Sequence, residues 1–181
     1  MPNLITNGGF ETGSFSGWTV TGNADGESLV TDFATKTYYP HSGSYYAMLG
    51  SFGSLSNLSQ TVATVPNSYY ALSYYLASDG GDPSQFIVTE NGAQLADLTD
   101  LPKSGYVEYT EDFYASSDQT TISFASRDDP GYLLLDDVSL VDPPSPAVPL
   151  PSSGVAAGVM LGMVGSFGLW RWRKQSVKPA I

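Results

Sequence analysis

Few side chains in this 181-residue sequence could carry out covalent chemistry. Cysteine is absent and His41 is the single histidine, which excludes thiol catalysis, disulfide bonds and Cys/His zinc sites. His41 lies in a Pro-His-Ser-Gly-Ser turn, and the sequence has no nucleophile-elbow motif. Acids are more numerous and include three neighbouring pairs: Glu111-Asp112, Asp128-Asp129 and Asp136-Asp137. Neighbours on a strand point apart, unlike the facing carboxylates of a glycosidase, so these pairs are more typical of solvated turns or cation sites.

Tyrosine offers a second kind of chemistry, because aromatic rings stack on the apolar faces of pyranose sugars. The chain has 12 tyrosines, and eight of them form adjacent pairs: Tyr38-Tyr39, Tyr45-Tyr46, Tyr69-Tyr70 and Tyr74-Tyr75. On a strand, each pair sends one ring outward. Tyr75, which precedes Asp79 and Asp82 in the next loop, is the best candidate for a sugar platform. The alternative is that these tyrosines fill the faces of a sandwich with only their hydroxyls in water.

Charge divides the chain into parts that need separate explanations. The net charge is −11, which repels phosphate backbones and makes nucleic acid a poor partner. All 18 acids lie at or before Asp142, with only three of the seven bases. We therefore predict a binding domain at 1–142, a Pro-rich linker at 143–153, an uncharged segment at 154–170 and a basic end at 171–181.

The elements that must position these residues are predicted to be short strands. Apolar residues alternate in runs separated by Gly, Pro, Asn and Asp, as in Tyr70, Leu72, Tyr74 and Leu76. Similar alternation recurs at these positions: Leu58, Gln60, Val62, Phe86, Val88, Val107, Tyr109, Phe113, Ile122, Phe124, Leu133 and Leu135. Glu90-Asn91-Gly92 is a hairpin signal, and no segment before Asp142 has a helical stripe. The domain is therefore all-β, a sandwich or jelly roll.

Several short motifs occur in a fixed order along the chain, and this order indicates a fold more specifically than any single motif does. They are Asn3-Leu4-Ile5-Thr6-Asn7-Gly8-Gly9-Phe10-Glu11, Gly17-Trp18, His41-Ser42-Gly43-Ser44-Tyr45, Leu58-Ser59-Gln60-Thr61-Val62, Tyr70-Ala71-Leu72-Ser73-Tyr74 and Leu135-Asp136-Asp137-Val138-Ser139-Leu140. This ordered set resembles the galactose-binding-like jelly roll of carbohydrate-binding modules of the 4/9/22 type. Because that fold hosts many unrelated binding functions, the resemblance implies the fold more firmly than the ligand.

The resemblance also implies a structural calcium ion. Related modules hold calcium near the first and last strands. The resemblance therefore implies Glu11 and Asp137 as metal ligands, with Asp136 as a third candidate. Hard carboxylate and carbonyl oxygens are the ligands that calcium prefers. The alternative is that one aspartate only accepts hydrogen bonds at a turn or strand end and that Glu11 faces solvent.

The C-terminal part is predicted to be a membrane segment, and the alternative is a C-terminal amphipathic or core helix. Residues 154–170 carry no charge and would span about 25 Å as a helix. A basic cluster with Arg171, Arg173 and Lys174 follows directly, next to Trp170 and Trp172. The positive-inside rule places this end in the cytoplasm and the acidic domain outside.

The same tail resembles the PEP-CTERM protein-sorting signal, also described as an ice-binding-protein C-terminal domain. The resemblance covers about 30 residues and rests on Pro149, Leu150 and Pro151, an apolar Gly-rich run and the basic end. Leu150 replaces the usual glutamate, as in a Val-Pro-Leu-Pro variant. The resemblance implies an exosortase-type transpeptidase as partner, transient inner-membrane anchoring and a final place on the cell surface or outside it. Such a protein is expected to carry a signal peptide, which the N-terminal residues lack, so we expect the true start to lie upstream.

Together these features predict an exported, non-catalytic binding module for extracellular or cell-surface polysaccharide. The alternative is a structural matrix or surface protein that mediates protein contacts without binding sugar. A glycosidase is the third possibility considered.

Overall fold

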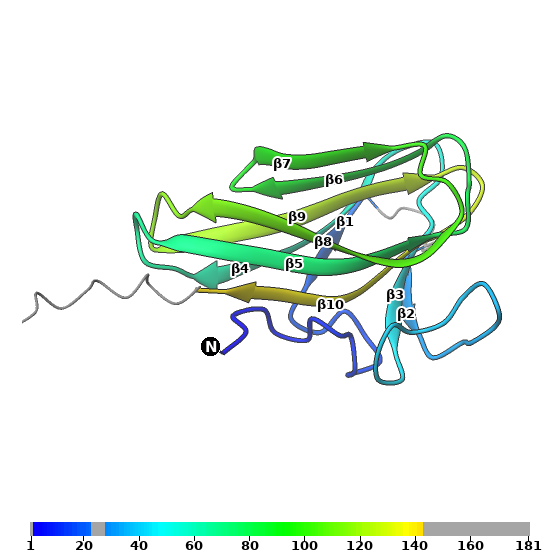
Figure 1. Ribbon diagram of the computed structural model, residues 1–181, viewed down its shortest axis with the longest axis horizontal. Helices are drawn as coiled ribbons and strands as arrows, with labels where there is room; N and C mark the ends of the chain where they lie inside the picture. The colour runs from blue at the N-terminus through cyan, green and yellow to red at the C-terminus, as the bar shows by residue number, and fades with distance from the viewer. Residues whose placement is uncertain (1, 23–27, 143–181) are drawn as a thin grey trace, which may run out of the picture. The chain divides into compact units, whose positions relative to one another are not determined.

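The computed structural model describes residues 2–22 and 28–142 of the chain, and in these residues it contains strands but no helix. Ten strands follow one another (Figure 1): β1 Thr19–Thr21, β2 Leu29–Thr31, β3 Tyr46–Leu49, β4 Ser56–Ala63, β5 Tyr69–Ser78, β6 Ser84–Glu90, β7 Ala93–Thr99, β8 Ser104–Tyr114, β9 Gln119–Asp128 and β10 Leu133–Val141. The prediction of an all-β domain is confirmed.

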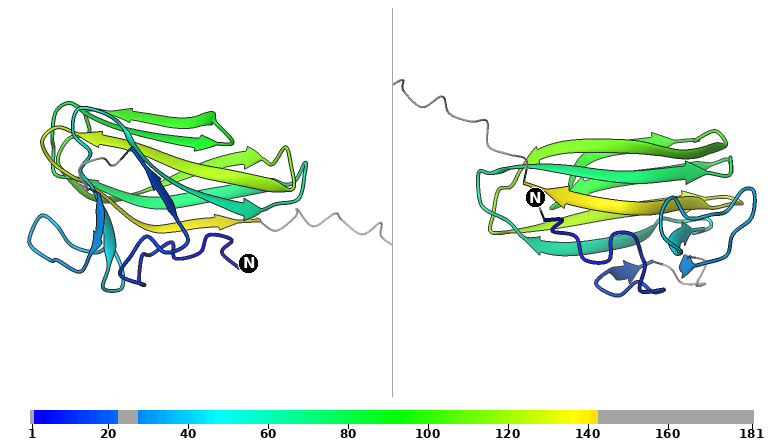
Figure 2. Two further views of the ribbon diagram at one scale, coloured as in Figure 1. Left: turned by 180° about the vertical axis from the view of Figure 1, so that it is seen from behind. Right: turned by 60° about the horizontal axis from the view of Figure 1, so that its bottom comes forward.

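The strands form two antiparallel five-stranded sheets that pack face to face, as Figure 2 shows from two sides. One sheet has the order β1-β4-β9-β6-β7, and the other has the order β2-β3-β10-β5-β8. Consecutive strands therefore often lie in different sheets, and the loops that join them cross between the layers. The result is the two-sheet β-sandwich that the strand pattern predicted.

The space between the sheets is filled by most of the predicted alternating residues, with the exception of Val107, which is 46% exposed. On β5, Tyr70, Leu72, Tyr74 and Leu76 all point inward and are at most 3% exposed. They pack in one core cluster with aromatic rings from the other sheet, and the Tyr74 ring lies 5.4 Å from that of Phe124. Burial of these large side chains is the main stabilising contribution to the sandwich, because the hydrophobic effect scales with the apolar area removed from water.

A second, smaller cluster covers part of the outer face of the β2-β3-β10-β5-β8 sheet. Its buried members are Tyr46, Met48, Ala77 and Leu134, and Tyr38, Tyr106 and Tyr132 pack against it. The loop between β2 and β3 supplies Tyr38 and folds back over the sheet. Leu134 is consequently buried even though it alternates with the inward Leu133 and Leu135.

Two local features position residues discussed below. Asn91 and Gly92 join β6 to β7 with φ values of 45° and 84°, the positive angles of a type I′ hairpin turn, as predicted. In β10 the pairing with β5 shifts between Asp136 and Ser139, and Asp137 itself has a φ of 48°. This irregularity bends the strand at the acidic pair.

The predicted linker, membrane segment and basic end at 143–181 lie outside the described residues, as do Pro149, Leu150, Pro151, Arg171, Arg173 and Lys174. The chain separates into the units Met1–Pro146 and Ala147–Ile181. Within residues 2–22 and 28–142, no helix has the length and apolar character needed to cross a membrane.

Candidate functional site

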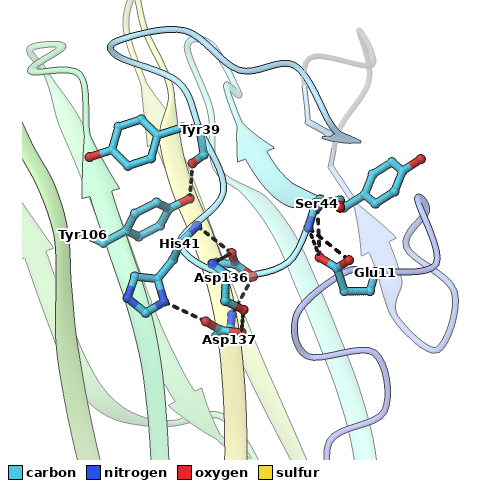
Figure 3. Close-up of polar contacts among 9 residues, drawn as sticks. Glu11, Tyr39, His41, Ser44, Tyr106, Asp136 and Asp137 are labelled. Atoms are coloured by element: carbon cyan, nitrogen blue, oxygen red, sulfur yellow. Dashed lines mark hydrogen bonds and ion pairs between the residues drawn. The ribbon is translucent and has the colours of Figure 1, made fainter.

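Three acids hold the turn at 41–45 onto the sandwich, and we call Glu11, Asp136 and Asp137 the acid clasp. Glu11 lies after the N-terminal segment, and its Oε1 accepts hydrogen bonds from the backbone N–H groups of Ser44 and Tyr45, both at 2.9 Å (Figure 3). Gly43 has a φ of 58°, and a Cβ at this position would overlap the Glu11 carboxylate. The Ser-Gly-Ser sequence therefore lets the turn approach the acid closely.

Asp136 is the buried member of the clasp, with no exposed surface. Its Oδ2 accepts from the N–H groups of His41 at 2.9 Å and Ser42 at 3.2 Å, and its Oδ1 accepts from that of Asp137 at 2.8 Å. Burial raises the pKa of Asp136 to about 6, and the three N–H donors oppose that rise. Nearby, the hydroxyl of Tyr106 donates to the Tyr39 carbonyl and closes the same loop over the strand.

Asp137 binds the side chains of the turn. Its Oδ2 lies 2.7 Å from His41 Nδ1, and its Oδ1 accepts from the Ser42 hydroxyl at 2.8 Å. The expectation that adjacent strand residues point apart is wrong for Asp136 and Asp137. The positive φ of Asp137 and the shift in β10 turn both carboxylates toward the same five-residue segment.

This grouping of serine, histidine and aspartate does not have the order of a catalytic triad. In a triad the imidazole stands between the hydroxyl and the carboxylate, so that it can take the hydroxyl proton. Here the Asp137 carboxylate stands between Ser42 and His41. The arrangement therefore orients the turn and leaves the Ser42 hydroxyl donating to an acid.

The clasp contains the residues predicted to bind calcium. An added Cβ on Gly9 would lie 3.3 Å from Asp137 Oδ1 and 3.8 Å from both Asp136 Oδ1 and Glu11 Cγ, so the three acids gather around this glycine. Hard oxygen ligands of this kind suit calcium. Across the described parts of the chain, however, no three His, Cys, Asp or Glu side chains lie close enough together to hold a metal ion. Calcium at the clasp remains a prediction.

Tyr75 lies beside the clasp on the outer face of the sheet. It pairs with Asp136 on β10 and with Glu108 on β8. The His41 ring stacks on it with a centroid distance of 3.7 Å and an interplanar angle of 15°. The prediction that Tyr74 points inward and Tyr75 outward agrees with their burial, although His41 covers one face of the Tyr75 ring.

Beyond Tyr75, the outer face of β5, β8 and β10 carries more aromatic and polar groups. Tyr69 and Tyr114 pair across the strands, their ring centroids are 5.3 Å apart, and Tyr114 is 68% exposed. Tyr75 lies six positions after Tyr69 on β5, a span of about 20 Å. We call this surface the tyrosine face; its members are Tyr69, Ser73, Tyr75, Glu108, Thr110, Asp112, Tyr114 and Ser139.

Each aromatic end of the tyrosine face is fixed by an acid from β8. A hydrogen bond with Asp112 raises the pKa of Tyr69. Burial, the charge of Glu108 and a hydrogen bond with Glu108 raise the pKa of Tyr75. Tyr69 belongs to one of the four tyrosine pairs identified in the sequence, whereas Tyr114 was missed. The signal was present, because 106, 108, 110, 112 and 114 alternate with the apolar positions that were identified on β8.

The chain matches no protein-family model and no curated protein. Its fold, in contrast, is similar to many solved structures. TmCBM61, solved in complex with β-1,4-galactotriose, is 22% identical, with 78% of this chain and 99% of that chain covered and a TM-score of 0.62. The xylan-binding domain CBM22-1 of Paenibacillus barcinonensis Xyn10C is 20% identical, with coverage of 73% and 89% and a TM-score of 0.55.

A third similar structure is described as an adhesin domain. The K1 cleaved adhesin domain of Lys-gingipain from Porphyromonas gingivalis is 16% identical, with coverage of 71% and 95% and a TM-score of 0.54. The domain thus has the two-sheet sandwich of carbohydrate-binding modules, shared with an adhesin domain. At these identities the similarity shows the fold alone.

Proposed function

We propose that this domain is a non-catalytic module that binds polysaccharide through the tyrosine face. The observation that carries the proposal is the placement of aromatic rings at both ends of one sheet face, with the exposed Tyr114 at one end, the half-buried Tyr75 at the other, and hydroxyls and carboxylates between them. Aromatic rings bind the apolar faces of sugars, and the polar groups between them pair with sugar hydroxyls. Its length of about 20 Å suits a chain of several sugar rings.

The structural neighbours support a neutral glycan as the first probe. TmCBM61 was solved in complex with β-1,4-galactotriose, and the CBM22-1 domain of Xyn10C is a xylan-binding domain. Glu108 and Asp112 make the tyrosine face negative, so it would repel an acidic polymer. We therefore take β-1,4-galactan and xylan as the polymers to test with this chain.

The test is affinity electrophoresis of the full chain in gels that contain either polymer. Tyr114→Ala removes the most exposed ring and is expected to weaken retention roughly five- to tenfold, about 1 kcal/mol. Tyr75→Ala is expected to act in the same direction, with a smaller effect because His41 already covers one side of the ring. Phe52→Ala, which removes an exposed ring elsewhere, is the control. Equal retention of all variants would contradict the proposal.

The second candidate is a matrix or surface protein that contacts other proteins. Exposed apolar side chains favour it, because Phe33, Phe52 and Val65 are each more than half exposed. An adhesin domain of Lys-gingipain has a similar fold, which is compatible with this second candidate. If neither polymer retards the chain, the matrix or surface protein becomes the favoured function.

We also propose that the tail beyond the described residues directs export and anchoring. Its support is the sequence alone: the Pro149-Leu150-Pro151 motif, the uncharged segment 154–170 and the basic cluster at Arg171, Arg173 and Lys174. An exosortase-type enzyme would remove the apolar end and leave the domain outside the cell. Intact mass of the exported protein tests this, since a product that still contains 171–181 would exclude proteolytic sorting.

A further inference from the structure

A second group of acids lies at one end of the sandwich, where β5 and β9 end (Figure 1). Three loops meet there, the connections β3–β4, β5–β6 and β9–β10. Backbone hydrogen bonds join them: Asp128 N–H donates to the Ser51 carbonyl at 3.0 Å, and Asp129 N–H donates to the Pro83 carbonyl at 3.1 Å. The position of the acids is therefore set by the main chain of both sheets.

Asp128, the last residue of β9, is the unusual member of this group. Its side chain is 1% exposed, and neither carboxylate oxygen has a hydrogen-bond partner within the described residues. The neighbouring base, Arg127, pairs with Asp129 instead. A buried carboxylate without a donor or a cation is costly, because nothing replaces the water it has lost.

Asp79, which follows β5, directs its carboxylate toward the same space. Its Oδ2 accepts from the Tyr38 hydroxyl at 2.9 Å and from Tyr132 N–H at 3.0 Å. A Cβ on Gly131 would overlap Asp79 Oδ1 and would lie 3.0 Å from Asp128 Oδ1. The carboxylates of Asp79 and Asp128 thus converge beside Gly131, which has no side chain to fill the space between them.

A main-chain oxygen lies in the same place. A Cβ on Gly81 would overlap Asp128 Oδ1 and would lie 2.9 Å from the Pro130 carbonyl oxygen. Beside these atoms is a cavity of about 190 Å³, lined by Asp128, Pro130 and four more residues, Gly50, Phe52, Gly131 and Tyr132. Burial and the charges of Asp79 and Asp129 raise the pKa of Asp128 to about 7, which reflects an unbalanced negative site.

We propose that Asp79, Asp128 and the Pro130 carbonyl form a cation site that binds calcium. Calcium takes six to eight oxygen ligands from carboxylates, carbonyls and water, and the adjoining cavity has room for the waters. The site offers no nitrogen or sulfur ligand, which disfavours zinc and softer metals. It differs from the acid clasp because neither carboxylate oxygen of Asp128 has a hydrogen-bond partner within the described residues, whereas every carboxylate of the clasp accepts N–H or O–H donors.

Such an ion would act as a bridge between the sheets. Asp79 directly follows β5 of one sheet, and Asp128 is the last residue of β9 in the other. Binding would neutralise the buried charge in the native state alone, because the two ligands are 49 positions apart in the sequence and do not meet in the unfolded chain. Calcium should accordingly raise the unfolding temperature.

The test is calcium titration of the full chain after treatment with EDTA, followed by calorimetry and by thermal unfolding. We expect calcium to bind and to raise the unfolding temperature, with magnesium less effective. Asp128→Asn should weaken calcium binding at least about tenfold, because it removes one of the two charged ligands. Asp137→Asn is the matched control, since it changes an aspartate of the acid clasp and leaves Asp79 and Asp128 intact.

Terbium luminescence places the ion independently of stability. Tyr38 donates its hydroxyl to Asp79, so its ring is close enough to sensitise terbium bound there. We expect Asp128→Asn to abolish the tyrosine-sensitised signal and Asp137→Asn to retain it. Loss of calcium binding in Asp137→Asn with retention in Asp128→Asn would assign the ion to the clasp and overturn the proposal. Absence of any calcium effect on the wild-type chain would also overturn it.

Discussion

The acid clasp and the Asp79–Asp128 pair each contain a deeply buried aspartate, and these two aspartates have opposite surroundings. Asp136 has no exposed surface and accepts three backbone N–H groups, whereas Asp128 is as deeply buried and accepts none. Burial raises the pKa of both. The comparison shows that burial does not define what an aspartate does. The hydrogen-bond donors around the carboxylate decide its role. With donors it stabilises the fold, and without them it is left able to bind a cation.

The largest effect is expected from Asp136→Ala, which removes the aspartate whose carboxylate is fully hydrogen-bonded. The change leaves the N–H groups of His41, Ser42 and Asp137 without their acceptor in a buried place. We expect the free energy of unfolding to fall by about 3 kcal/mol. Urea unfolding measures it, with the exposed Asp32→Ala as control. A loss no larger than that of the control would show that the clasp contributes little to stability.

The next effect has the opposite sign. In EDTA, Asp128→Asn removes a buried, unpartnered charge and should stabilise the protein at pH 8 by about 1–2 kcal/mol. The folded-state pKa of Asp128 is about 7, above its ordinary value of 3.8. The wild-type chain therefore loses stability as pH rises through this window, and the variant does not.

Unfolding at pH 5 and pH 8 measures that difference. The advantage of Asp128→Asn should be small at pH 5, where Asp128 is mostly protonated in the folded state, and should grow toward pH 8. A variant less stable than wild type at pH 8 in EDTA would mean that the Asp128 carboxylate has a stabilising partner.

The smallest effect is expected at the exposed end of the clasp. Glu11→Gln keeps an oxygen that can accept from Ser44 and Tyr45 but removes the charge, so the cost should be about 1 kcal/mol. Gly43→Ala adds a Cβ that would overlap the Glu11 carboxylate. If the two costs are additive in the double variant, Glu11 does not hold the turn through this contact.

Much of the sandwich could be predicted from local alternation. The inward positions of β5 and the Asn91-Gly92 turn follow from a period of two and from the angles that glycine and asparagine tolerate. The prediction that Glu11, Asp136 and Asp137 converge also agrees with their common contacts to 41–45. These features depend on short-range sequence rules or on an ordered motif set.

Other features depend on contacts that local patterns do not encode. The bend at Asp137 requires a positive φ that an Asp-Asp pair does not signal. The cover of His41 over Tyr75 depends on how a long loop folds back on the sheet. Asp79 and Asp128 meet only because the ends of β5 and β9 reach the same end of the two sheets. Strand order, which sequence alternation leaves open, decides that meeting.

The edge strands of the two sheets affect whether the protein aggregates at high concentration. The edges formed by β1 and β2 are only three residues long, which leaves little backbone for another chain to pair with. The longer edges carry acids: Asp97 lies on β7, and Glu108, Glu111 and Asp112 lie on β8. Both devices oppose the growth of a sheet from one molecule to the next. The domain is therefore built to stay dispersed at high local concentration and to resist aggregation through its strand edges.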